Sequence, residues 1–136
     1  MLQSNRFSYP AIKMDEFDKP GSYEWECFQV LAYEFPDDDP SDAERKIKTR
    51  LRRKKLGQYD SNRIATLRQL KNALQQEVAV LCGNSQYYLG LKGTAAGSED
   101  FDFARMVKDF RGRFPNVPRD EIARAVSFAV FIYYVR

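Results

Sequence analysis

The stretch that decides the fold is SNRIATLRQLKNALQQEVAVLC, residues 61–82. Its apolar residues recur at intervals of three and four, which places them within about 120° of one face of an α-helix. Asp60 or Ser61 is suited to cap the start of a helix over 62–82, and Gly83 with Asn84 is suited to end it. The apolar stripe consists of Ile64, Leu67, Leu70, Leu74, Val78 and Leu81. Because one such face must be covered by other elements, the stretch predicts a helical core.

A second helix is predicted immediately upstream, over 41–56. Ser41 and Glu44 have the spacing of a capping box, and Gly57 supplies a C-terminal stop. The connection to the next helix is short, so the two should form an antiparallel pair or a helix-turn-helix corner. The apolar stripe of this second helix is narrow and consists of Ala43, Ile47 and Leu51.

Residues 22–35 fit two patterns. Their apolar residues match both a helical period and the period of two that is typical of a strand. Ser22 as an N-cap, two glutamates in the first turn and a length of about fourteen residues favour a helix that Pro36 ends.

Two further helices are predicted in the second half of the chain. Ser98 is placed to cap a helix through Phe114, with Phe103, Ala104, Val107, Phe110 and Phe114 on its inner face. Pro118 suits the first turn of a last helix that runs to Val135. This last helix is apolar on nearly all sides, so it is either central to the core or covered on one side by a second copy of the chain.

The chain is therefore predicted to be a mainly α, single compact domain of four to five helices. An irregular arm over 1–21 precedes a helical body over 22–136, and residues 86–97 form one glycine-rich loop. The length of 136 residues suits a single domain. The aromatic residues of the arm suggest that it packs against the body in places.

Charge is segregated along the chain. Residues 1–44 carry a net charge of −8, residues 45–71 a net charge of +10, and residues 72–136 a net charge of +1. Such a block of positive charge attracts phosphate, and arginine offers bidentate hydrogen bonds to it. Tyr59, in the adjoining turn, is placed to stack on a base. The candidate nucleic-acid contacts are Arg45, Lys46, Lys48, Arg50, Arg52, Arg53, Lys54, Lys55 and Arg63. Two alternatives remain: the acidic front of the chain folds over this helix and neutralises it, or the basic residues form only a solvated surface.

Several kinds of site are excluded or disfavoured by composition. The chain has no histidine and two cysteines, so an imidazole base, a Ser-His-Asp triad and a four-ligand zinc site are excluded. The acidic run at 37–42 lacks the order of a calcium loop, and residues 90–98 lack the order of a P-loop. We therefore expect no enzyme activity, no metal and no cofactor. Without a signal-like segment or a twenty-residue apolar run, we also expect a cytoplasmic protein with no membrane contact.

Two functions remain at this point. The first is a non-enzymatic helical module that contacts the backbone of DNA or RNA through the basic helix, as a small subunit or regulator of a larger assembly. The second is a protein–protein adaptor or inhibitor. In the second case the basic helix meets an acidic protein surface, or the acidic arm mimics nucleic acid toward a basic partner. A homo-oligomer formed through the aromatic C-terminal helix is compatible with either.

Overall fold

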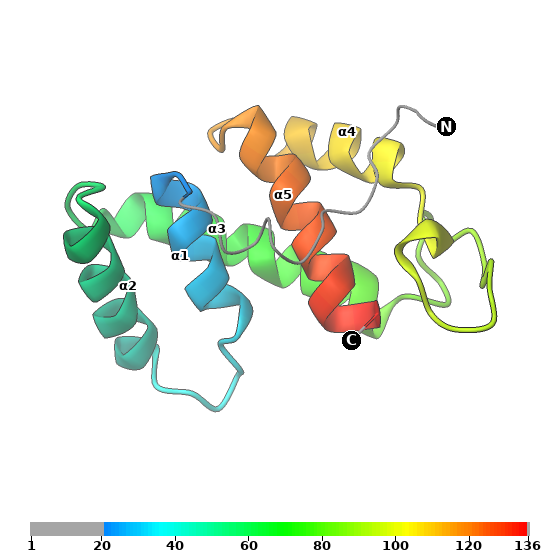
Figure 1. Cartoon of the computed structure of the whole chain (residues 1–136), viewed down its shortest axis with the longest axis horizontal. Helices are drawn as coiled ribbons and strands as arrows, with labels where there is room; N and C mark the ends of the chain where they lie inside the picture. The colour runs from blue at the N-terminus through cyan, green and yellow to red at the C-terminus, as the bar shows by residue number, and fades with distance from the viewer. Residues whose placement is uncertain (1–20, 136) are drawn as a thin grey trace.

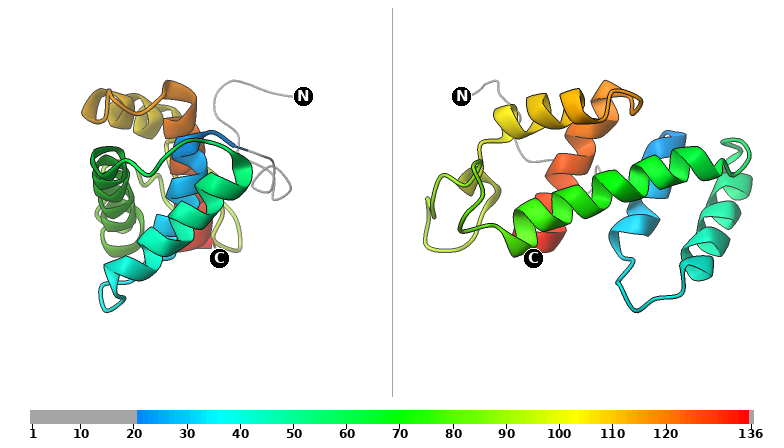
Figure 2. Two further views of the ribbon diagram at one scale, coloured as in Figure 1. Left: turned by 90° about the vertical axis from the view of Figure 1, so that its left-hand side faces the viewer. Right: turned by 180° about the vertical axis from the view of Figure 1, so that it is seen from behind.

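Helix α3 (Ser61–Gln75) is the element around which the chain is built (Figure 2). The computed structural model describes residues 21–135, and α3 packs there against both α1 (Tyr23–Ala32) and α5 (Arg119–Val130). The predicted stripe is buried from Ile64 to Val78. The prediction was wrong for Leu81, which is 37% exposed. A π-helical turn, η3 (Gln76–Val80), extends α3, and its i→i+5 bonding changes the phase of the face before Leu81 is reached.

The remaining elements complete a mainly α domain. They are α2 (Pro40–Lys54), the 3₁₀ turn η4 (Ser98–Asp100), α4 (Phe103–Arg113) and the π-helical turn η5 (Phe131–Val135). Over residues 21–135 there are five α-helices and no strand, apart from an isolated antiparallel bridge between Tyr88 and Phe101. The predicted fold class is confirmed. The predicted arm lies, except for Gly21, outside the described residues.

The N-terminal caps show where local prediction succeeded and where it failed. The Ser22 hydroxyl accepts a hydrogen bond from the Trp25 amide at 3.2 Å, so the predicted helix forms and not a strand. The predicted end was wrong, because α1 ends at Ala32 and not at Pro36. For α2 the cap is Asp39 and not Ser41, because the Asp39 carboxylate accepts the Ser41 amide at 3.0 Å. That bond holds the pKa of Asp39 below its usual range. Pro40 takes the first helical position, which its fixed φ suits.

The helix predicted from Ser98 begins later. Residues 98–100 form only the turn η4, and α4 starts at Phe103 with Asp102 as its cap. Asp100 is fully buried, and its carboxylate accepts hydrogen bonds from the Lys92 and Gly97 amides at 2.7 and 3.2 Å. Tyr134 donates a third hydrogen bond to the same carboxylate, at 2.6 Å. Because Asp100 closes the glycine-rich loop in this way, the chain turns before α4 begins.

Two residues expected on the inner face of α4 lie elsewhere. Ala104 is exposed and Phe114 is only partly buried, and Met106 is fully buried in their place. This difference in the buried face accompanies the start of α4 at Phe103 instead of at Ser98.

Helix α5 lies at the centre of the core. Its residues 125–130 are all buried. Other elements of the same chain therefore cover this part of the helix on all sides. Phe128 packs edge-on against Trp25, with ring centroids 5.4 Å apart, and so joins α5 to α1. The two π-helical turns η3 and η5 also pack against one another. Among the helices of residues 21–135, none is long and apolar enough to cross a lipid bilayer.

Candidate nucleic-acid interface

Helix α2 lies at the edge of the molecule with one narrow buried seam. Ala43, Ile47 and Leu51 form that seam, and α2 packs against α1. In Figure 1, α1 lies between α2 and α5. The eight cations of residues 45–55 occupy the rest of the circumference of α2 and the residue that follows it. The three glutamates of residues 22–35 lie on α1 or just after it. The ion pairs between these glutamates and the cations therefore decide which cations are available to an outside ligand.

Glu26 neutralises the inner side of α2. Its side chain is 2% exposed and accepts a hydrogen bond from Arg50 Nη1 at 3.1 Å. Lys54 Nζ lies 3.6 Å from the same oxygen, Oε1. The Gly21 amide donates to the other oxygen at 3.1 Å. Arg50 and Lys54 are therefore bound to a carboxylate of the same chain, and they fix α2 to α1.

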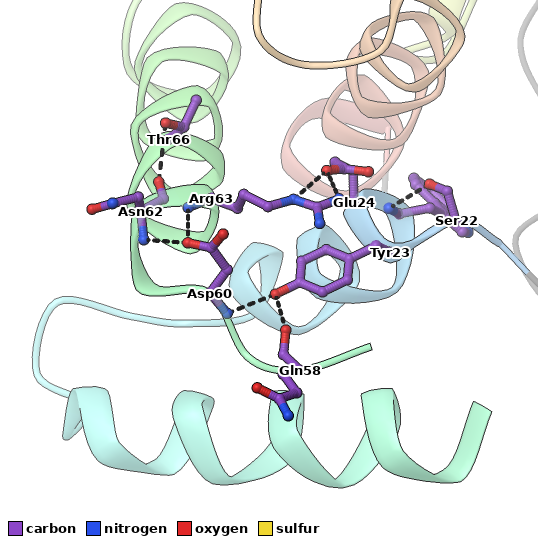
Figure 3. A network of polar contacts seen from close by, with 9 residues as sticks. Ser22, Tyr23, Glu24, Gln58, Asp60, Asn62, Arg63 and Thr66 are labelled. Atoms are coloured by element: carbon purple, nitrogen blue, oxygen red, sulfur yellow. Dashed lines mark hydrogen bonds and ion pairs between the residues drawn. The ribbon is translucent and has the colours of Figure 1, made fainter. Parts of the chain in front are cut away.

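The other two glutamates pair with cations of α3. Arg63 donates to Glu24 through Nε at 2.9 Å and through Nη2, and its guanidinium lies over the Tyr23 ring at 3.7 Å (Figure 3). Arg68 makes two hydrogen bonds to Glu34, at 2.8 and 2.9 Å. The predicted contact Arg63 is thus held in a structural ion pair.

Tyr23 fixes the connection between α2 and α3. Its hydroxyl donates to the Gln58 carbonyl at 2.9 Å and accepts from the Asp60 amide at 2.8 Å (Figure 3). Asp60 in turn caps α3. The position of α2 relative to α3 is therefore set by a buried phenol as well as by the ion pairs.

Two further cations are paired only at the surface. Arg45 contacts Asp42 at 3.0 Å and Lys48 contacts Glu44 at 2.8 Å, with all four side chains about half exposed. The bond to Glu44 raises the pKa of Lys48. Exposed pairs of this kind contribute about 0–1 kcal/mol and are screened by salt, so a phosphate can replace either carboxylate.

The last four cations are Lys46, Arg52, Arg53 and Lys55. All four are exposed, and none makes an ion pair with any other residue in the range 21–135. Arg45, Lys48 and Arg52 follow one another at intervals of three and four, and Lys55 comes three residues later. At 1.5 Å per residue the helical part of this row spans about 10 Å. We call Arg45, Lys48, Arg52 and Lys55 the outer ridge.

A cleft of about 910 Å³ lies beside α2, on a different side of the helix from most of the outer ridge. The wall on the α2 side is lined by Lys46, Arg50 and Arg53, and by Arg45, the first residue of the outer ridge. Its opposite wall is formed by Gln29 and Val30 of α1 and by three aromatic residues, Tyr33, Phe128 and Phe131. The cleft therefore combines cations with apolar rings.

The sequence did not single out Tyr33, which follows the last residue of α1 and is 49% exposed. Its signal was an aromatic residue at the very end of a helix whose other large side chains are buried. Tyr59, predicted as a stacking residue, is partly buried, and Lys48 Nζ lies 5.2 Å from the centre of its ring.

The two other motifs weighed in the sequence have structural roles. In the acidic run, Asp38 accepts the Phe35 amide at 2.9 Å and Asp39 caps α2. The glycine-rich loop is closed by Asp100. In the described part of the chain, no group of three His, Cys, Asp or Glu residues is arranged to hold a metal ion.

No protein-family model, curated protein or solved structure matches this chain. The candidate interface therefore rests on its own geometry.

Proposed function

We propose that this protein is a non-enzymatic helical module that binds the phosphate backbone of nucleic acid through the exposed face of α2. The observation that carries the proposal is the division of the cations of α2 by the fold. Glu26 takes Arg50 and Lys54. Four cations remain exposed with no ion pair in residues 21–135, and two more hold only surface pairs.

The geometry suits a phosphate backbone for two reasons. The cations stand on α2 or directly after it, and α2 is held against α1 by its buried seam and by the ion pairs to Glu26, so binding costs little loss of backbone freedom. Each phosphate that they neutralise releases condensed counterions, which favours binding at low salt. With four to six contacts, the slope of log K against log salt is expected to be about −4 to −5 for duplex DNA.

Binding of this kind carries little sequence information, because backbone contacts fix position without reading bases. We therefore expect duplexes of different sequence to bind with similar affinity. Such a module suits a small subunit or regulator whose specificity comes from its assembly.

The test is a salt titration of binding to a fluorescently labelled 20-base-pair duplex of random sequence. The variant Lys46→Gln/Arg52→Gln/Arg53→Gln/Lys55→Gln should bind more weakly to every sequence and show a flatter salt slope. A matched control removes the same charge from exposed cations on the other half of the molecule, by substitution with Gln at Lys92, Lys108, Arg113 and Arg119.

The control should retain most of the affinity and salt dependence of the wild type. An equal loss in both variants would mean that binding follows net charge alone, and it would overturn the assignment to α2. Undetectable binding by the wild type at 20 mM salt would overturn the function itself. In that case an acidic protein surface becomes the expected partner of α2.

A further inference from the structure

The exposed cations of α2 lie on two different sides of the helix. Each residue of an α-helix is turned by about 100° from the one before it, so the directions of the side chains follow from their positions. Lys46 and Arg53 lie within about 20° of one another around the axis of α2, and Lys48 and Arg52 within about 40°. The two pairs are about 100–160° apart. All four residues are exposed. We call Lys46 and Arg53 the cleft-side pair, and Lys48 and Arg52 the ridge-side pair.

The surface of α2 between the two pairs is also exposed. Arg45 and Thr49 lie there, on the side of the helix opposite its buried seam. Thr49 is small, and its hydroxyl donates a hydrogen bond to the Arg45 carbonyl at 3.0 Å, so this group is held against its own helix. A ligand that contacts both pairs can therefore come close to the backbone of α2 between them.

Helix α2 lies at one end of the molecule, with α1 on its inner side (Figures 1 and 2). The inner cations, Arg50 and Lys54, are the two bound to Glu26. The acidic residues of α2, Asp42 and Glu44, lie near its N-terminal end, and no acidic residue follows them on the helix. The part of α2 that faces away from the body is therefore positive on both sides over most of its length.

A helix with cations on both sides matches the major groove of B-form DNA. This groove is about 12 Å wide and about 8.5 Å deep, and it admits an α-helix. With its side chains an α-helix is about 10–12 Å across, so cations on its two sides reach the phosphates of both strands. The major groove of an RNA duplex is deep and narrow, and a single strand has only one backbone. Of these three forms, a DNA duplex alone places phosphates against both pairs.

We infer that α2 enters the major groove of double-stranded DNA, with the cleft-side pair on the phosphates of one strand and the ridge-side pair on those of the other. The inference rests on the proposed function and adds the class of nucleic acid and the groove. All four contacts are to the backbone, in agreement with binding that depends little on sequence. DNA duplexes are therefore bound more tightly than RNA duplexes or single strands of equal length.

The experiment measures the affinity of the full chain for four labelled ligands. They are a 20-base-pair DNA duplex, an RNA duplex of the same sequence, one DNA strand alone, and the DNA duplex with every cytosine replaced by glucosylated 5-hydroxymethylcytosine. The glucose occupies the major groove and adds no charge, so the fourth ligand tests the groove without changing the phosphates.

Two variants test the two sides of α2 separately. Lys46→Gln/Arg53→Gln neutralises the cleft-side pair, and Lys48→Gln/Arg52→Gln neutralises the ridge-side pair. The matched control is Lys108→Gln/Arg119→Gln, which removes two exposed charges from the other half of the molecule. Circular dichroism and the unfolding midpoint establish that each variant is folded.

We expect each pair variant to bind the DNA duplex about 10- to 60-fold more weakly at about 100 mM salt, and to flatten the salt slope by about two units, because each pair contacts two phosphates. The control variant should bind like the wild type. The wild type should bind the RNA duplex, the single strand and the glucosylated duplex about tenfold more weakly than the unmodified DNA duplex, since each of these leaves at least one pair without its phosphates.

The outcomes separate this inference from the proposed function. Equal affinity of the wild type for all four ligands, or tighter binding of the single strand, would overturn the major-groove inference and leave the proposed function in place. A loss in only one of the two pair variants would do the same, because it would mean that α2 contacts a single backbone. If none of the four ligands binds at 20 mM salt, both the inference and the proposed function fall.

Discussion

Glu26 should be the carboxylate whose loss most changes both stability and binding. Neutralising it as Glu26→Gln keeps the shape of the side chain but removes the charge that holds Arg50 and Lys54. The variant should be less stable than the wild type, because two cations lose their buried partner. It should also bind nucleic acid more tightly, because the same two cations become available to phosphate.

The magnitude follows from the burial of the three groups. Removing one partner of a fully buried ion pair costs about 3–5 kcal/mol. Here Glu26 is 2% exposed, but the side chains of Arg50 and Lys54 are 35% and 36% exposed and can turn toward water. We therefore expect a loss of about 2–3 kcal/mol, which for a chain of this length lowers Tm by about 10 °C.

The assay is urea unfolding and thermal melting, beside a salt titration with labelled duplex. Glu44→Gln is the matched control, since it makes the same change of charge in an exposed pair with Lys48 and should cost no more than about 0.5 kcal/mol. The salt slope of Glu26→Gln should steepen by about one to two units. Equal stability of the two variants would refute the idea that Glu26 neutralises the inner side of α2.

Three other substitutions test the fold and its polar contacts. Leu74→Ala should cost about 2–5 kcal/mol in urea unfolding, because Leu74 is fully buried on α3; a change within experimental error would contradict the packing of that face. Tyr23→Phe removes both hydrogen bonds to the loop before α3 and should cost about 1–2 kcal/mol, and an unshifted urea midpoint would show that the loop is held otherwise. The hydrogen bond from Tyr134 and the two backbone amides hold the pKa of Asp100 below its usual range. Its carboxylate therefore stabilises the fold above the ordinary Asp pKa of about 3.9, and this contribution is lost as the pH falls through the folded pKa. Asp100→Asn should flatten the acid side of a Tm–pH profile, and an unchanged profile would contradict this role.

Local patterns predicted the helices well, because a helical face and its caps depend on residues a few positions apart. The Ser22 cap and the stripe of α3 are of this kind. Where two residues of similar capping propensity compete, the pattern is insufficient. Asp39 caps α2 in place of Ser41, and Pro40 at the first helical position was the signal that distinguishes them.

The ion pairs could not be predicted from the sequence. Glu26 pairs with Arg50 across 24 positions, and Glu24 with Arg63 across 39. Charge segregation left open whether the acidic and basic segments meet, and only the packing of α1 between α2 and α5 decides which cations are paired. For the same reason the sequence suggested all nine basic residues as contacts, whereas the fold distinguishes those held by glutamates of α1 from those that face outward.

Lysine acetylation footprinting tests the central claim most directly, because it measures each amine separately. In the free protein, Lys46 and Lys55 should be acetylated rapidly, whereas Lys71 should react slowly because it is 5% exposed and its Nζ donates a hydrogen bond to the Glu34 carbonyl at 3.2 Å. Saturating the protein with the 20-base-pair duplex should protect Lys46 and Lys55 and leave the distant Lys108 unchanged. Slow labelling of Lys46 and Lys55 in the free protein, or equal labelling with and without the duplex, would contradict the account.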